Sequence, residues 1–275
     1  TFEQNVTFKA KVHNSSHTPT GSVTFYDGAA SLGDVALTGD SAEVSTVDLA
    51  VGSHTIKAVY SGDGNFNPDS ASLLQTVNKA TPTVTLASDL NPSTFGGDII
   101  FTGKVHNSSH QPTGNVRFYD GVEPIGTVGL TGDSAQLIIA SLTAGSHSIK
   151  AVYGGDGNFD SSASNIVTQV VNKAPTTNSL TATPNPSEFF QAVNFRDSVS
   201  GPPDGGKVYF SVDNTVLDSA AVDGNGIAAV STANMAFGSH SISAYYGGTS
   251  NFDTSTSNTV TQVVKPDTFA ITASA

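Results

Sequence analysis

Short runs of alternating hydrophobic and polar residues follow one another along the chain, and none keeps a helical period over a useful length. The clearest run is GSHSIKAVYGGDGNF, residues 145–159, in which His147, Ile149, Ala151 and Tyr153 share one parity. Side chains of one parity lie on one face of a strand, so this face can be buried. The Gly, Asp and Asn residues that follow tolerate the backbone of a sharp turn. The stretch therefore predicts a strand followed by a tight turn.

This stretch occurs three times in closely similar form, starting at Gly52, Gly145 and Gly238, so the period is 93 residues. A fixed period of this size indicates tandem domains rather than one large domain. We expect a first repeat at 1–79, a middle repeat at 80–172 and a third repeat at 173–265, followed by a short segment at 266–275.

The middle repeat contains about seven short β segments separated by turn residues, a number and rhythm typical of an immunoglobulin-like sandwich. The cysteine and tryptophan that often mark the core of that fold are absent. Large apolar residues must therefore fill each core. The expected ones are Phe8, Phe25, Tyr60 and Phe66 in the first repeat, Phe101, Phe118, Tyr153 and Phe159 in the middle one, and Phe195, Phe210, Tyr246 and Phe252 in the third.

The composition narrows the class of partner. Lys and Arg number 11 against 23 Asp and Glu, which gives a net charge of −12. Nucleic acid and anionic membranes reward clustered basic residues, so neither is an expected partner. Without cysteine there is no disulfide, thiolate metal site or cysteine nucleophile. Charged residues make up only 12% of the chain while Gly, Ser, Thr, Asn and Val are abundant, a balance typical of secreted all-β proteins. No apolar run approaches the length of a membrane span and no signal peptide is visible, so we expect a processed chain or a fragment.

Several motifs resemble the bacterial Ig-like repeat family. They are PTGSVTFYDG at 19–28, PTGNVRFYDG at 112–121, the Gly-Ser-His strand and the GDGNF turn. The third repeat departs most, because Thr249-Ser250 replaces the Asp-Gly of that turn. The resemblance implies domains that occur in tandem in large bacterial surface and secreted proteins. That family has no shared active site, so it implies a non-enzymatic chain located at the cell surface or outside the cell.

The linkers at 77–82 and 171–175 are short and contain proline. Proline fixes φ and few residues are free, so we expect a semi-rigid connection. The predicted fold is all-β, with three tandem Ig-like sandwiches in an end-to-end rod.

The two ends are out of phase with the repeat. Thr1 aligns with Thr94, so the first repeat lacks a counterpart of the opening strand at 83–86. After the third repeat, Phe269 and Ile271 take the places of Val84 and Leu86.

An open sheet edge templates pairing with another strand. One hypothesis is therefore that residues 268–275 of one molecule complete the first repeat of the next, with Phe269 and Ile271 as anchors beside an acceptor edge formed by Val6, Phe8 and Ala10. Such a contact does not close on itself and builds a filament of copies. The alternative is that the chain is a segment of a longer repeat array that serves as the spacer of a bacterial surface adhesin. Neighbouring repeats of the same chain would then supply the strand.

The sequence gives weaker signals for metal, glycosylation, catalytic and carbohydrate-binding sites. His13 with His17 and His106 with His110 are spaced four apart, but in a predicted loop and without a completing carboxylate. The turn aspartates do not form a calcium loop, although the net charge leaves calcium open. Because His54, His147 and His240 share the inward parity of their strand, structural hydrogen bonds are expected there. The Asn-X-Ser/Thr sequons at Asn5, Asn14 and Asn107 are expected by chance in this composition. No cofactor and no catalytic grouping is predicted, and a carbohydrate-binding module is disfavoured by the absence of Trp.

Overall fold

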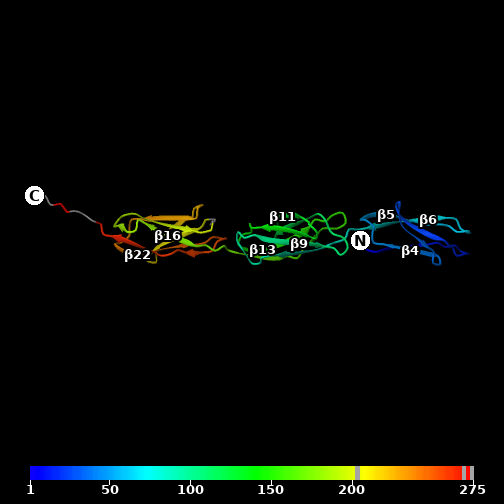
Figure 1. Ribbon diagram of the computed structural model, residues 1–275, viewed down its shortest axis with the longest axis horizontal. Coiled ribbons are helices and arrows are strands. Elements are labelled where there is room, and N and C mark those ends of the chain that lie inside the picture. The colour runs from blue at the N-terminus through cyan, green and yellow to red at the C-terminus, as the bar shows by residue number, and fades with distance from the viewer. Residues whose placement is uncertain (202–204, 268–270, 273–275) are drawn as a thin grey trace. The chain divides into compact units, whose positions relative to one another are not determined.

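The computed structural model describes residues 1–201, 205–267 and 271–272, and within them the protein consists of β-strands with no helix (Figure 1). In particular, the described residues include no helix of the length and apolar character that a membrane span requires. The chain groups into two compact units. One comprises Thr1–Ala87, Phe101–Leu137 and Ser148–Val167, and the other Ser88–Ile100, Ile138–His147 and Thr168–Ala275, so each unit contains part of the middle repeat.

The first repeat has six strands in two sheets. They are β1 (Val6–Lys11), β2 (Ser22–Asp27), β3 (Ala30–Ala36), β4 (Ser41–Thr46), β5 (Gly52–Tyr60) and β6 (Asp69–Val77). The larger sheet has the order β3-β2-β5-β6, and the smaller one contains β1 and β4. Tight turns such as the one after Asp27 fix the register, because Gly28 adopts a positive φ of 58° that suits glycine.

The middle repeat has nine strands. They are β7 (Thr83–Ser88), β8 (Ser93–Thr94), β9 (Ile99–His106), β10 (Asn115–Asp120), β11 (Glu123–Gly129), β12 (Ser134–Ile139), β13 (Gly145–Tyr153), β14 (Ser162–Ala163) and β15 (Val167–Asn172). The larger sheet has the order β11-β10-β13-β15-β8, with β14 also on β13, and the smaller one the order β12-β9-β7.

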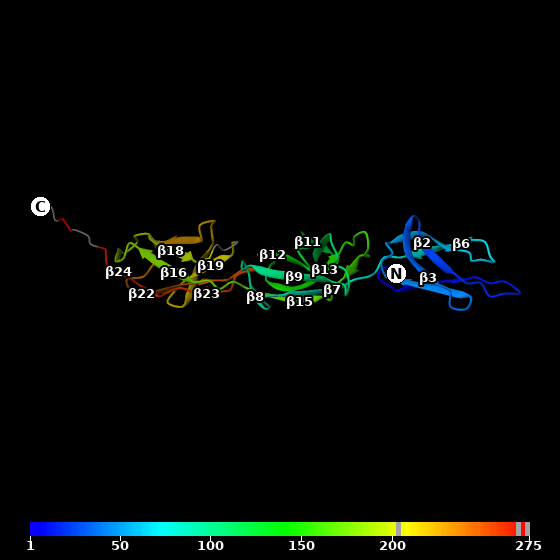
Figure 2. The ribbon, with the colours of Figure 1, turned by 45° about the vertical axis from the view of Figure 1, so that its right-hand side comes forward.

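The third repeat has the same plan. Its strands are β16 (Asn178–Thr183), β17 (Ser187–Glu188), β18 (Val193–Val199), β19 (Lys207–Val212), β20 (Thr215–Ala221), β21 (Ile227–Thr232), β22 (Gly238–Tyr246), β23 (Ser255–Thr256) and β24 (Val260–Lys265). Its sheets are β17-β24-β22-β19-β20, with β23 on β22, and β16-β18-β21. Figure 2 shows β16 and β18 side by side.

The repeats differ in the smaller sheet. The middle and third repeats each have a strand on both sides of the central strand, whereas β1 pairs with β4 alone among the described residues. The predicted sandwich fold is confirmed, and the first repeat has a smaller sheet of two strands instead of three.

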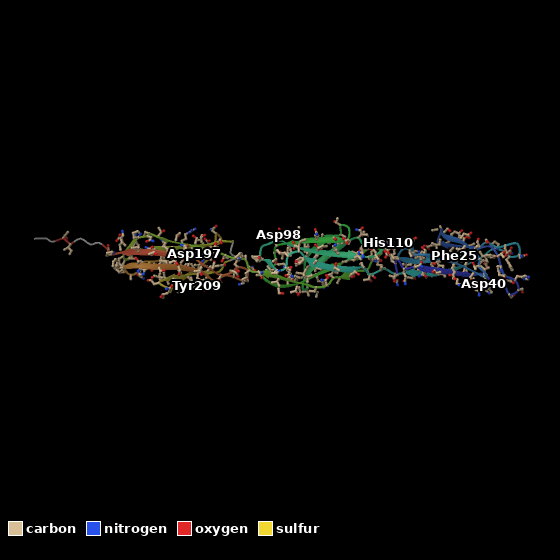
Figure 3. All side chains as sticks on the ribbon, turned by 60° about the horizontal axis from the view of Figure 1, so that its bottom comes forward. Phe25, Asp40, Asp98, His110, Asp197 and Tyr209 are labelled. Atoms are coloured by element: carbon tan, nitrogen blue, oxygen red, sulfur yellow. The ribbon has the colours of Figure 1, made fainter. Side chains whose placement is uncertain are left out.

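The aromatic cores follow the alternating pattern. The predicted aromatic residues of the middle and third repeats are all buried, and in the first repeat Phe8, Tyr60 and Phe25 (labelled in Figure 3) are buried. Phe66 differs from the prediction because it is only partly buried, whereas its counterparts Phe159 and Phe252 are 1% and 5% exposed. The physical reason is ring packing, because Phe2 packs on Phe159 and Phe95 on Phe252, whereas no ring among the described residues packs on Phe66.

Candidate strand-acceptor groove

A groove of about 410 Å³ runs along the first repeat between β1 and β6. Its floor is apolar because it reaches the core residues Val23, Phe25 and Ile56. The residues that line it are Phe8, Lys9, Ala10, Lys11, Val12, His13, Val23, Phe25, Ile56, Ala58, Tyr60, Asp69, Ser70, Ala71, Ser72 and Leu73. The groove therefore lies directly over the core of this repeat, although Val23, Phe25 and Ile56 are themselves buried.

In the other two repeats an opening strand lies beside the strand that corresponds to β1. In the third repeat β16 pairs with β18 in antiparallel register, with Leu180 opposite Asp197 and Ala182 opposite Phe195. Leu180 is 2% exposed, and in the middle repeat Val84 and Leu86 of β7 are each 5% exposed. An opening strand thus buries alternate apolar side chains between the two sheets.

The acceptor residues predicted from the sequence lie on β1. Phe8 and Ala10 line the groove, and Val6 lies on the same strand outside the lining. On its other edge β1 is paired with β4, with Phe8 opposite Val44. Of the predicted donor anchors, Phe269 lies outside the described residues, and Ile271 is 86% exposed.

One functional residue escaped the sequence analysis. In the middle repeat the side chain of Asn165 accepts a hydrogen bond from Leu86 N at 3.0 Å and donates one to Leu86 O at 3.3 Å. Asn258 does the same to Leu180 in the third repeat, at 2.9 and 3.1 Å. Both side chains fasten an opening strand to the opposite sheet, so this asparagine acts as a clamp.

The clamp depends on a bulge that the first repeat lacks. In the third repeat Ile242 faces Val260 and Tyr245 faces Thr256, so one extra residue lies between these pairs on the partner strand. In the first repeat β5 and β6 pair without interruption from Gly52–Val77 to Tyr60–Asp69. The sequence carried a signal for this difference, because Phe66 and Val77 are 11 positions apart and their counterparts Phe252 and Val264 are 12.

The GDGNF turn of the first repeat is held by hydrogen bonds to the loop that contains Thr20. Asp63 accepts hydrogen bonds from Thr20 N and Thr20 Oγ1, both at 2.8 Å, and from the backbone of Asn65 and Phe66 at 2.8 and 2.9 Å. These bonds, led by that from the Thr20 amide, lower the pKa of Asp63 to about 2. Tyr60 Oη donates to Thr20 O at 2.6 Å. The turn aspartate is thus engaged in holding the loop.

The histidines of the repeated strand are structural, as predicted. His54 contacts Asp27 Oδ2 at 2.7 Å and Ala50 O at 2.8 Å, and His240 contacts Asp213 Oδ2 and Ala236 O at 2.7 and 2.9 Å. The Ala50 carbonyl and then the Asp27 carboxylate raise the pKa of His54. The pKa of His240 is also raised, first by the Asp213 carboxylate and then by the Ala236 carbonyl. His147 contacts Thr143 O at 2.8 Å in the same way.

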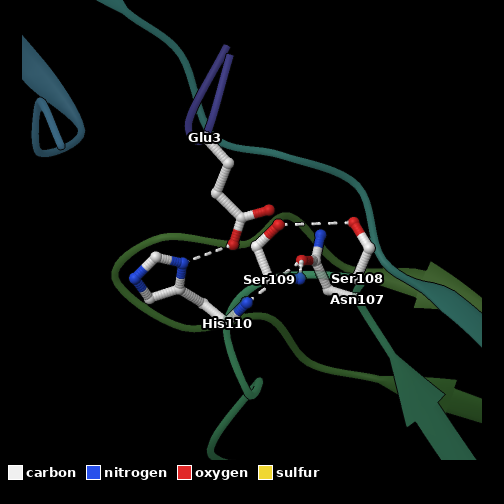
Figure 4. Close-up of polar contacts among 5 residues, drawn as sticks. All are labelled: Glu3, Asn107, Ser108, Ser109 and His110. Atoms are coloured by element: carbon white, nitrogen blue, oxygen red, sulfur yellow. Dashed lines mark hydrogen bonds and ion pairs between the residues drawn. The ribbon is translucent and has the colours of Figure 1, made fainter. Parts of the chain in front are cut away.

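His110, a predicted member of a loop pair, contacts a residue far away in sequence. Its Nδ1 lies 2.7 Å from Glu3 Oε1, while Asn107 Oδ1 accepts from the backbone of Ser109 and His110 (Figure 4). Within the described residues no three His, Cys, Asp or Glu side chains are grouped closely enough to hold a metal ion.

Solved structures of tandem domains are similar to this chain. Domains A168–A170 of titin share 13% identity, with 96% of this chain and 94% of that one covered at a TM-score of 0.39. The full ectodomain of mouse nectin-like molecule 4, Ig1–Ig3, shares 10% identity, with 98% and 97% covered at 0.35. Fibronectin(III)-like modules of Clostridium thermocellum CbhA share 20% identity, with 70% and 100% covered at 0.29. At these values the likeness carries no argument about function.

No curated protein matches the chain. The model of one family, described as bacterial Ig-like domain (group 3), matches residues 1–78, 85–172 and 180–265. These three matches fall on the three repeats and cover most of the chain. The chain therefore belongs to the group 3 family of bacterial Ig-like domains, of which it contains three tandem copies.

Proposed function

We propose that this chain is a non-enzymatic structural element of the bacterial cell surface or extracellular space that assembles head to tail by strand complementation. In this assembly the segment after the third repeat of one copy occupies the groove of the first repeat of the next. The family match supports the coarser part of the proposal, because domains of this type are typically non-catalytic and typical of bacterial surface and secreted proteins.

The groove between β1 and β6 is the observation that carries the finer part. It lies along an edge of β1 that pairs with no other described strand, above apolar core residues, and it corresponds to the position that β7 and β16 occupy in their own repeats. An incoming extended segment gains backbone hydrogen bonds at the edge and buries alternate side chains below it. The segment at 268–272 has apolar side chains at alternate positions, Phe269 and Ile271, as this geometry requires.

The second candidate is a spacer within a longer surface protein. In the middle and third repeats, the opening strand comes from the same chain. A segment of the same polypeptide that precedes the first repeat would fill the groove in the same way, and the chain would then form part of a stalk.

Particle mass in solution distinguishes the two candidates. For the protein 1–275 we expect light scattering and electron microscopy to show filaments or a ladder of oligomers that disappears with Ile271→Asp. Val122→Asp is the matched control, because Val122 is also 86% exposed and lies in a turn away from the groove. A protein that stays monomeric at all concentrations would contradict head-to-tail assembly, and the spacer function would remain as the proposal.

A disulfide trap tests the contact itself, since the chain has no cysteine of its own. Ser72 lines the groove of the acceptor, so the proposed donor strand would bring Ile271 close to it. Mixing a Ser72→Cys variant with an Ile271→Cys variant under mild oxidation should give a mixed dimer faster than either variant alone gives its own dimer. Equal rates in the three samples would overturn strand complementation between copies.

A further inference from the structure

Three phenylalanines gather at the end of the third repeat where β24 ends, and we call Phe189, Phe190 and Phe237 the exit patch. Phe190 is 67% exposed and Phe237 66% exposed, and the rings of Phe189 and Phe190 lie 4.0 Å apart. Their shared position follows from the sheet register, because Glu188 pairs with Lys265 and Gly238 with Val264. Large aromatic side chains exposed together mark a surface that binds a partner.

The residues at the same positions of the first repeat contact the repeat that follows. Phe2 corresponds to Phe189, and its ring lies 5.7 Å from Phe159, edge to face, and 5.1 Å from His110. Glu3 corresponds to Phe190 and bonds to His110. This end of the repeat is therefore a docking face in the first junction.

The second junction uses the same positions. Phe95 corresponds to Phe189 and lies 5.4 Å from Phe252, edge to face. Ala144 corresponds to Phe237, and its backbone N donates to Asn251 Oδ1 at 3.0 Å. In both junctions the contacts include the turn of the next repeat that contains Phe159 or Phe252, and in the first junction they also include His110.

The backbone at the exit patch is strained. Phe190 has a φ of 63° and Glu3 a φ of 69°, whereas the middle repeat has Gly96 there with 81°. A side chain in this left-handed region is unfavourable compared with glycine. At Glu3 the strained residue provides a contact to the next repeat, which suggests the same use for Phe190.

The first repeat carries the matching receiving residues. Phe66 occupies the place of Phe159 and is only partly buried, and His17 occupies the place of His110 and is exposed. Phe66 and His17 are thus the counterparts of Phe159 and His110, the two rings on which Phe2 packs in the first junction.

We propose that the exit patch docks on Phe66 and His17 of the first repeat of a second copy. This inference rests on the proposed head-to-tail assembly and names its second contact, beside the donated strand. Elsewhere the linker itself reinforces the junction, since Ala80 N donates to Asn158 O and Ala174 N to Asn251 O. After the third repeat, Pro266 and Asp267 stand at the positions that Lys and Ala occupy in both internal linkers. We infer that the aromatic contact replaces part of the linker's contribution there.

A single tryptophan reports on the patch, because the chain contains none. With Phe190→Trp we expect fluorescence that shifts to the blue and becomes protected from acrylamide as concentration rises. The matched probe Val216→Trp, on an exposed strand of the same repeat, should not change. Emission of Phe190→Trp that is independent of concentration would overturn the docking.

Variants separate this contact from strand complementation. Phe190→Asp combined with Phe237→Asp should weaken association about tenfold or more, as expected for the loss of aromatic anchors, while Val216→Asp should not. Phe190→Gly should also weaken association yet raise the unfolding midpoint, because it relieves the strained backbone. If both patch variants associate as strongly as the wild type, docking of the exit patch is refuted. Strand complementation would still stand in that case, provided that the mixed disulfide between positions 72 and 271 forms. If that disulfide fails while the Phe190→Trp signal persists, the strand proposal fails alone.

Discussion

The side chain of Asn165 holds both backbone groups of Leu86, with the Leu86 amide donating to Oδ1 at 3.0 Å and Nδ2 donating to the Leu86 carbonyl at 3.3 Å. The two residues are 79 positions apart, with Leu86 in β7 and Asn165 between β14 and β15. The same pair recurs as Asn258 and Leu180. A side-chain amide thus imitates a neighbouring strand and binds backbone groups of the opening strand, which pairs with only one strand of its sheet.

Replacing the clamp should loosen the opening strand without unfolding the repeat. For Asn258→Ala we expect a loss of about 1–3 kcal/mol in the free energy of unfolding of the third repeat, the usual cost of leaving partly buried backbone groups unpaired. Hydrogen exchange at the Leu180 amide should accelerate more than exchange at the core of β22. Asn67→Ala, at an exposed position of the first repeat, serves as the control. Unchanged exchange at Leu180 would show that the clamp is not needed.

Asp197 gives the third repeat an unusual pH dependence. It is fully buried where the other repeats have Ala10 and Gly103, its Oδ2 accepts from Asn178 Nδ2 at 2.9 Å, and Oδ1 has no hydrogen-bond partner (Figure 3). Burial raises the pKa of Asp197 from 3.8 to about 6, partly opposed by the bond from Asn178. The folded state therefore favours the protonated form, and stability should fall as pH rises between about 4 and 6.

The substitution Asp197→Ala should remove this effect. We expect the third repeat to gain roughly 1–3 kcal/mol at neutral pH, because no unpaired carboxylate oxygen remains in the core. Thermal unfolding at pH 4.5 and 7 checks it, since the wild type should lose more stability between these values than the variant, in which only the raised pKa of His240 still contributes. A variant less stable than wild type at pH 7 would contradict the argument.

The turn aspartate Asp156 should behave in the opposite sense. It accepts from Thr113 N and Oγ1 at 2.8 and 2.9 Å and from the backbone of Asn158 and Phe159 at 2.8 and 2.9 Å. Burial opposes ionisation, but these bonds outweigh it and lower the pKa of Asp156 to about 2. Its stabilisation is therefore present above pH 3.8 and lost as pH falls towards 2.

Asp156→Ala should cost the middle repeat about 2–4 kcal/mol, since a charged acceptor of several hydrogen bonds is lost. Urea unfolding at pH 7 measures this loss, and Asp98→Ala, at an exposed carboxylate of the same repeat, provides the comparison. In the third repeat Thr249 stands in the place of the aspartate, and its Oγ1 accepts hydrogen bonds from two backbone amides. Asp156→Thr should therefore lose less stability than Asp156→Ala. Equal midpoints for Asp156→Ala and Asp98→Ala would rule the account out.

The linker contact at Ala80 should control how firmly the first junction is held. Ala80 N donates to Asn158 O at 3.0 Å, Asp160 N donates to Ala80 O at 2.8 Å, and Lys79 Nζ donates to Asp156 O at 2.5 Å. Ala80→Pro removes the first donor, so we expect exchange of the Asp160 amide to accelerate about 10- to 100-fold. Ala80→Ser keeps the donor and should exchange like the wild type. If Ala80→Ser accelerates as much as Ala80→Pro, side-chain packing rather than this bond holds the junction.

Local patterns in the sequence determined the strands, the turns and the three copies. Alternation of apolar residues in the run that ends at Tyr153 is a property of neighbouring residues, and so is the turn chemistry of Asp156. These signals were sufficient for the sandwich fold, for the structural role of His54 and for the family. They also indicated that β1 would have an open edge.

The tertiary structure alone decided which distant groups meet. The clamp of Asn165 on Leu86, the burial of Asp197 and the contact between Glu3 and His110 join residues whose spacing follows no local period. Phe66 stands at a position of the repeat that the sequence predicts to be in the core, but its exposure depends on whether another ring covers the turn. Sequence periodicity determines which face of a strand is buried, whereas a groove, a clamp or a docking face depends on what packs against that face from elsewhere.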